Sequence, residues 1–97
     1  MTNRTVFFVS DGTGITAETF GNSILAQFST KHRHVRRPFI DSMEKAEQVV
    51  REVNETVITE GRRPVVFLTL VNGDVCRFIS ERCNALVMDM FRSFIEP

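Results

Sequence analysis

The residues most able to do chemistry form one polar run directly after an apolar segment, where residues 6–18 read V-F-F-V-S-D-G-T-G-I-T-A-E. Four consecutive apolar residues at 6–9 predict a short strand buried on both faces. Two glycines follow, which let a backbone approach a ligand closely or adopt positive φ. A helix starting at about residue 15 would add unpaired N–H groups and a partial positive charge. The pattern is typical of an anion-binding turn, with Ser10, Asp11, Gly12, Thr13, Gly14 and Thr16 as the candidate phosphate or ligand contacts.

One alternative for this run is a dinucleotide site. Gly12, Gly14 and Ala17 fit the G-x-G-x-x-G/A fingerprint that follows the first strand of such folds. Asp41 stands near the place of the ribose-binding acid, although later than the usual spacing. The carboxylate of Asp11 lies just before the first glycine, where it would repel a pyrophosphate. We therefore rank a dinucleotide-binding half-domain last among the three functions that we consider for this chain.

Two further loop chemistries are excluded by the residues present. Phosphatases that form an aspartyl-phosphate carry Asp-x-Asp-Gly-Thr, and here Val9 occupies the place of the nucleophile. No glycine of the sequence begins a G-x-x-x-x-G-K-[ST] phosphate loop. What remains is an anion-binding loop or a plain turn in which Thr13 or Thr16 only caps the helix, and the sequence favours neither.

The second candidate is the basic segment K-H-R-H-V-R-R at residues 31–37. Arg33, Arg36 and Arg37 could contact phosphate or an acidic partner. The alternative, which we favour, is a solvated edge strand that its charges protect from aggregation. His32 and His34 share a strand face, but a third metal ligand is not evident, so we predict no metal site.

Composition sets the class of protein. Ninety-seven residues fit one domain. The charges of the twelve basic and twelve acidic side chains cancel, so no overall electrostatic field favours binding to nucleic acid or to a membrane. No apolar run approaches the roughly 18 residues that span a bilayer, and the first residues run straight into a strand without a signal peptide. We therefore expect a cytoplasmic protein that binds neither nucleic acid nor membrane.

Hydrophobic patterns predict four strands and three helices that alternate along the chain. The second strand covers the basic segment and ends at Phe39 and Ile40, and Pro38 places it at a sheet edge. The second helix is expected to begin with Asp41 as its N-cap. The other strands are expected at residues 6–9, 64–71 and 85–90, and the helices at about 15–29, 42–60 and 72–83.

This alternation predicts an α/β fold with three layers and a parallel sheet in the order 2-1-3-4, a flavodoxin-like or Rossmann-like half. The first helix would cover one face, leaving that face bare beside the third and fourth strands. Phe91, Phe94 and Ile95 would extend the bare area. We therefore expect residues 1–97 to be one domain of a longer chain that lacks its closing C-terminal elements, and to form a homodimer.

Four blocks of the sequence resemble the bacterial phosphoenolpyruvate synthase regulatory protein family. The likeness runs along essentially the whole chain. The blocks are V-F-F-V-S-D-G-T-G-I-T-A-E-T-F-G-N-S-I-L-A-Q-F (6–28), H-V-R-R-P-F-I-D (34–41), R-P-V-V-F-L-T-L-V (63–71) and D-M-F-R-S-F-I-E-P (89–97).

The resemblance implies a bifunctional serine/threonine kinase and phosphorylase. Such proteins use ADP to phosphorylate a threonine of phosphoenolpyruvate synthase, and reverse this with inorganic phosphate, releasing pyrophosphate. The family's phosphate-binding loop lies beyond Pro97, so the resemblance implies an N-terminal domain with no cofactor of its own and no identifiable catalytic residue. We expect this chain to be inactive alone. The second functional alternative is a non-catalytic module for dimerisation or partner docking.

Overall fold

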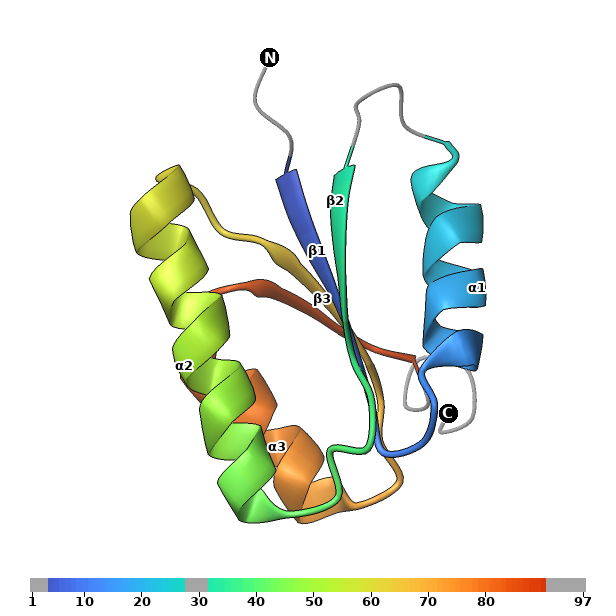
Figure 1. Ribbon diagram of the computed structural model, residues 1–97, viewed down its shortest axis with the longest axis vertical. Helices are drawn as coiled ribbons and strands as arrows, with labels where there is room; N and C mark the ends of the chain where they lie inside the picture. The colour runs from blue at the N-terminus through green and yellow to red at the C-terminus, as the bar shows by residue number, and fades with distance from the viewer. Residues whose placement is uncertain (1–3, 28–31, 91–97) are drawn as a thin grey trace.

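The computed structural model describes residues 4–27 and 32–90 of the chain. The described part is an α/β fold in three layers with one sheet of parallel strands in the order β2-β1-β3-β4, as predicted (Figure 1). The elements in chain order are β1 (Arg4–Ser10), α1 (Ile15–Leu25), β2 (His32–Arg37), α2 (Met43–Glu60), β3 (Val65–Thr69), α3 (Gly73–Arg82) and β4 (Leu86–Asp89).

The sheet is covered by α1 on one face and by α2 and α3 on the other (Figure 1). β1 is the centre of the fold, because alternate residues of this strand belong to the two opposite cores. Phe7 and Val9 pack with α2 and α3, while Val6 and Phe8 pack on the side of α1. This double burial explains why the predicted strand reads as a continuous apolar run.

Gly21 allows α1 to lie directly on the sheet. A Cβ atom at this position would lie 2.1 Å from Cε1 of Phe8, closer than real Cβ contacts come. The Phe8 ring is fully buried and stacks on Phe67 with ring centroids 5.6 Å apart. The glycine inside the helix thus marks a close packing contact, and the cost of glycine in a helix interior is the sequence signal for it.

The predicted end of β2 is wrong, although its place at the sheet edge is right. The strand ends at Arg37, before Pro38 rather than after it. Phe39 adopts a left-handed backbone with φ of 60°, which is rare for a residue with a side chain. The chain leaves the sheet here because this turn directs the next amides toward the end of β1.

Two helix ends also differ from the predicted ones. Ser42, not Asp41, caps α2, since the Ser42 hydroxyl accepts a hydrogen bond from the Lys45 amide at 3.3 Å. Asp41 lies outside the helix and pairs instead with the Lys45 ammonium at 3.0 Å. α1 ends at Leu25, four residues before its predicted end. At the other end of α2, Gly61 is the C-cap and adopts the left-handed conformation that glycine favours after a helix.

The prediction of a bare sheet face holds only in part. On the α1 side of β3, the side chains of Phe67 and Thr69 are 1% and 3% exposed, because α1 contacts β3 as well as β1. The exposed apolar residues on this face are Leu86 and Met88 of β4, each 39% exposed. Residues 91, 94 and 95 lie outside the described residues. Among the helices that the structure describes, none has the length and apolar character needed to cross a membrane.

Candidate functional site

The Ser10–Gly14 loop lies at the carboxyl end of the central strand, where it turns into α1. Part of its hydrogen bonding is internal, because the Ser10 hydroxyl accepts from the Gly12 amide at 3.0 Å. The Thr13 hydroxyl accepts from the Ile15 amide at 3.4 Å, a weak bond. Gly14 is the N-cap of α1 and has no side chain to cap it. The first turn of α1 therefore begins without the usual side-chain acceptor.

Hydrogen bonds join the loop to the segments that follow both neighbouring strands. On one side, Oδ2 of Asp11 accepts from the amide of Val71, just after β3, at 2.9 Å. On the other side, the amides of Phe39 and Ile40 donate to main-chain carbonyls of the loop at 2.8 Å each. One carboxylate oxygen of Asp11 is thus committed to the protein itself, which the sequence could not indicate.

The two glycines of the loop play different parts. Gly14 has φ of 86°, a conformation that side chains disfavour, and an added Cβ would lie 3.0 Å from Cδ of Arg36. Gly12 has no left-handed backbone, and an added Cβ would meet nothing closer than the Ser10 hydroxyl at 3.9 Å. Folding therefore explains Gly14, whereas Gly12 leaves open space beside the backbone, where a ligand could approach.

The basic segment is divided between the two faces of the sheet. Arg36 pairs in register with Phe8 and lies on the α1 side, where its stem covers Gly14 and its guanidinium is 3.9 Å from Glu18. Arg33 and Arg37 lie on the α2 side, because successive strand residues alternate. Of the three predicted arginines, the structure thus brings only Arg36 to the loop.

Thr69 is a polar residue at the loop that sequence reasoning missed. It pairs in register with Ser10, and both side chains are buried on the α1 side. The Thr69 hydroxyl oxygen has no hydrogen-bond partner, which is costly for a buried polar atom. The available signal was a hydroxyl at the end of an otherwise apolar strand. Thr16, the remaining predicted residue, is exposed in the first turn of α1.

Arg37 forms a structural ion pair. Its Nε donates to Oε1 of Glu52 at 2.7 Å, and its Nη2 bonds the second carboxylate oxygen. This hydrogen bonding raises the pKa of the Arg37 guanidinium above its ordinary value. Both side chains are more than a third exposed, so solvent screening keeps the contribution of the pair to stability small. The role of Arg37 is thus to fix β2 against α2.

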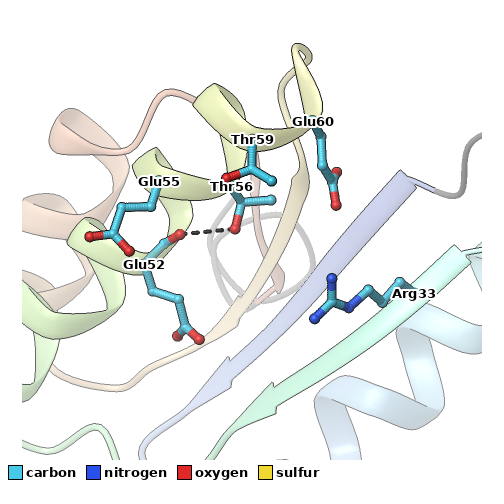
Figure 2. A pocket seen from close by; sticks show the side chains of 6 residues that line it. All are labelled: Arg33, Glu52, Glu55, Thr56, Thr59 and Glu60. Atoms are coloured by element: carbon cyan, nitrogen blue, oxygen red, sulfur yellow. Dashed lines mark hydrogen bonds between the residues drawn. The ribbon is translucent and has the colours of Figure 1, made fainter.

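Arg33 faces a polar hollow between β2 and α2 rather than the loop (Figure 2). The carboxylates of Glu52, Glu55 and Glu60 share this hollow with it. Within the ranges 4–27 and 32–90, no group of three or more histidine, cysteine, aspartate or glutamate residues is arranged to hold a metal ion.

The loop has the parts of an anion site. An uncapped helix start supplies amides and a partial positive charge, Arg36 supplies a cation beside it, and Gly12 gives room for close approach. Two carboxylates oppose this, Glu18 in the first turn and Asp11 in the loop. The amides and the arginine have the chemistry that suits an anion such as phosphate, whereas the two carboxylates do not.

A family model and several known proteins match the sequence of this chain. The sequence model of the Kinase/pyrophosphorylase family matches residues 6–97. A protein of Leptothrix cholodnii named "Putative phosphoenolpyruvate synthase regulatory protein" is 68% identical over 97 residues, which are 100% of this chain and 36% of that protein. Proteins of the same name from Methylibium petroleiphilum and Paracidovorax citrulli are 67% and 62% identical over the whole chain, which covers 35% and 36% of them.

The chain thus spans about a third of the length of these relatives. The family match nevertheless extends from β1 through every described element, and includes the Ser10–Gly14 loop and the basic segment. On this evidence, the chain belongs to the kinase/pyrophosphorylase family.

Proposed function

We propose that this chain is the N-terminal α/β domain of a regulatory protein that modifies phosphoenolpyruvate synthase in the cytoplasm. The whole protein transfers the terminal phosphate of ADP to a threonine hydroxyl of the synthase and leaves AMP. In a second, separate reaction, inorganic phosphate attacks the phosphothreonine, which frees the threonine hydroxyl and releases pyrophosphate. The observation that carries this proposal is the 68% identity along all 97 residues to a protein whose name describes it as a phosphoenolpyruvate synthase regulatory protein.

The experiment compares a full-length protein containing these 97 residues with the 97-residue chain alone. Each is mixed with phosphoenolpyruvate synthase and ADP labelled in its β-phosphate. We expect label on a synthase threonine with the full-length protein and none with the short chain, because phosphoryl transfer needs positioned cations and phosphate-cradling amides together. Failure of the full-length protein to label the synthase would refute the proposed activity, and labelling by the short chain would refute our assignment of the catalytic parts elsewhere.

Within this domain, the Ser10–Gly14 loop binds a phosphate group at the start of α1, with Arg36 as the neighbouring cation. The support is geometric: Gly14 leaves the helix start uncapped, and the Arg36 stem lies against it. Inorganic phosphate and the phosphates of ADP are the ligands that the family's chemistry supplies. Asp11 and Glu18 oppose the anion, so we expect weak binding.

Gly12→Ala tests this site without disturbing the fold, because its Cβ would meet only Ser10 at 3.9 Å. We expect phosphate binding, measured by titration with 15N-resolved amide shifts, to weaken in Gly12→Ala and in Arg36→Gln. Arg51→Gln on the exposed face of α2 serves as the matched control and should bind as the wild type does. If the loop amides of the wild-type chain do not shift when phosphate is added, the Ser10–Gly14 loop is only a turn and the proposed site is refuted.

A docking or dimerisation module is the second candidate, and the edge strand β4 favours it. β4 pairs only with β3 within the described sheet, and Leu86 and Met88 are both 39% exposed on it. A second copy of the chain could cover these side chains through a two-fold contact. Light scattering at micromolar concentration should then show a dimer that Leu86→Glu dissociates, whereas a strict monomer would remove this candidate.

A further inference from the structure

A polar hollow of about 190 Å³ lies between β2 and the C-terminal half of α2 (Figure 2). It is at the amino end of the sheet, since Arg33 pairs in register with Thr5 and Glu60 is the last residue of α2. The Ser10–Gly14 loop is at the other end of β1, so the two places are separate. The residues that line the hollow are Arg33, Glu52, Glu55, Thr56, Thr59 and Glu60.

The two walls of the hollow carry opposite charges. Arg33 extends its guanidinium from β2 into the space, while Glu60 points into it from the end of α2 (Figure 2). None of the ion pairs between described residues includes Arg33. Glu52, by contrast, is already engaged by Arg37, so its charge is largely compensated. The hollow therefore holds a cation and carboxylates that do not neutralise one another directly.

The carboxylate of Glu60 is a second feature of the hollow that indicates a missing partner. One of its carboxylate oxygens accepts a hydrogen bond from the Thr5 hydroxyl. The other oxygen, Oε1, is buried and has no hydrogen-bond partner. A buried charged acceptor without a donor is among the costlier defects of a folded protein. Since Oε1 has almost no accessible surface, an occupant of the hollow reaches it only when the Glu60 side chain turns toward the hollow. A group that then brought an N–H donor and a positive charge to Oε1 would remove this defect.

The charged groups that line the hollow limit the class of molecule that can bind in it. Among the residues that the structure describes, no cluster suited to a metal ion is present, so a divalent cation does not fit. A simple organic cation would be attracted by Glu60 and Glu55 but repelled by Arg33. A simple anion would be attracted by Arg33 but repelled by the two carboxylates. A molecule with an ammonium at one end and a carboxylate at the other satisfies both walls.

We propose that this hollow binds a small zwitterion of the α-amino acid class. With the Glu60 side chain turned toward the hollow, the ammonium of the ligand donates to Oε1 of Glu60, and its carboxylate accepts from the guanidinium of Arg33. The threonine hydroxyls of the α2 wall, of which Thr59 is one, offer further contacts to a polar side chain. The volume of about 190 Å³ leaves room for a small amino acid. This inference is independent of the activity proposed for the whole protein.

The test titrates the chain with each of the standard L-α-amino acids and follows the amide resonances of Arg33, Thr59 and Glu60. Ethanolamine, which is serine without its carboxylate, and L-lactate, which is L-alanine with a hydroxyl in place of its ammonium, serve as matched probes. We expect at least one amino acid to shift these resonances saturably, and both single-charge probes to bind at least about tenfold more weakly because each loses one charge-assisted hydrogen bond.

Glu60→Gln and Arg33→Gln should each weaken amino acid binding by at least about tenfold for the same reason. Glu47→Gln and Arg51→Gln make the same charge changes at exposed positions of α2 outside the hollow, and should leave binding unchanged. Circular dichroism establishes that all four variants are folded. The proposal is overturned if no amino acid shifts the three resonances, if ethanolamine or L-lactate binds as tightly as the amino acids, or if the control variants lose as much affinity as Glu60→Gln.

Discussion

Gly21→Ala should destabilise the protein, although the same change stabilises an ordinary exposed helix. The position lies inside α1, directly above the Phe8 ring. An added methyl group would meet Cε1 of that ring at 2.1 Å and two further ring atoms at 3.1 Å. The ring has no room to withdraw, because it is fully buried, stacks on Phe67 and meets the edge of His34 with centroids 5.3 Å apart.

The magnitude follows from two opposing effects. Replacing glycine by alanine inside a helix gains about 1 kcal/mol from helix propensity. Overpacking a closely packed core costs about 1–3 kcal/mol, and a 2.1 Å approach to a fixed ring belongs at the upper end. We therefore expect a net loss of about 2 kcal/mol in the free energy of unfolding. For a domain of this size, that loss lowers Tm by roughly 8–16 °C.

Urea denaturation of the 97-residue chain, followed by circular dichroism, measures this loss. Asn22→Ala, at the next and exposed position of α1, is the control and should change stability by no more than about 0.5 kcal/mol. Phe8→Leu removes the obstructing ring, so the double variant should show a favourable coupling energy of at least about 0.5 kcal/mol in the mutant cycle. A Gly21→Ala chain as stable as the wild type, or more stable, would show that α1 is not pressed against β1.

Three further predictions follow from the contacts of single residues. Gly14→Ala should unfold at a lower urea concentration than the wild type, because φ of 86° and the 3.0 Å approach to Arg36 both penalise a side chain; an unchanged midpoint would contradict the loop geometry. Lys45 lowers the pKa of Asp41 by hydrogen bonding and charge, so this pair should stabilise α2 above the unfolded pKa of Asp41 and be lost as the pH falls through its lowered folded value; Lys45→Gln should return the pKa, followed by NMR, toward its ordinary value. Burial raises the pKa of the Cys83 thiol to about 11, so its alkylation by iodoacetamide near neutral pH should be much slower than in urea, and equal rates would show that the thiol is accessible.

The architecture could be predicted because it depends on patterns that are local in sequence. The alternation of apolar strands with amphipathic helices, together with Pro38 near one strand, was enough for the order of the four strands. Gly21 likewise revealed a close contact, because glycine inside a helix has a known cost. These signals belong to single elements and need no knowledge of the neighbours.

The Ser10–Gly14 loop could be predicted from the sequence, but the way in which other residues are arranged around it could not. The strand end at Arg37 and the cap at Ser42 depend on the left-handed turn at Phe39, whose amide bonds a loop far away in sequence. The division of the arginines follows from strand alternation, yet which face each one takes is fixed by the register with β1. The unpartnered hydroxyl of Thr69 and the unpartnered oxygen of Glu60 become visible only when their surroundings are known.

The hydrogen bonds that join the loop to its neighbours differ in what could break them. Two of the acceptors, opposite the amides of Phe39 and Ile40, are main-chain carbonyls that persist whatever side chains the loop carries. The third acceptor, opposite the Val71 amide, is the side chain of Asp11 and depends on that residue alone. Hydrogen–deuterium exchange can therefore read the two attachments separately. In Asp11→Ala, the Val71 amide should exchange faster while those of Phe39 and Ile40 keep their protection, so the crossover that follows β3 could be released from the loop while the segment after β2 stays fastened to it.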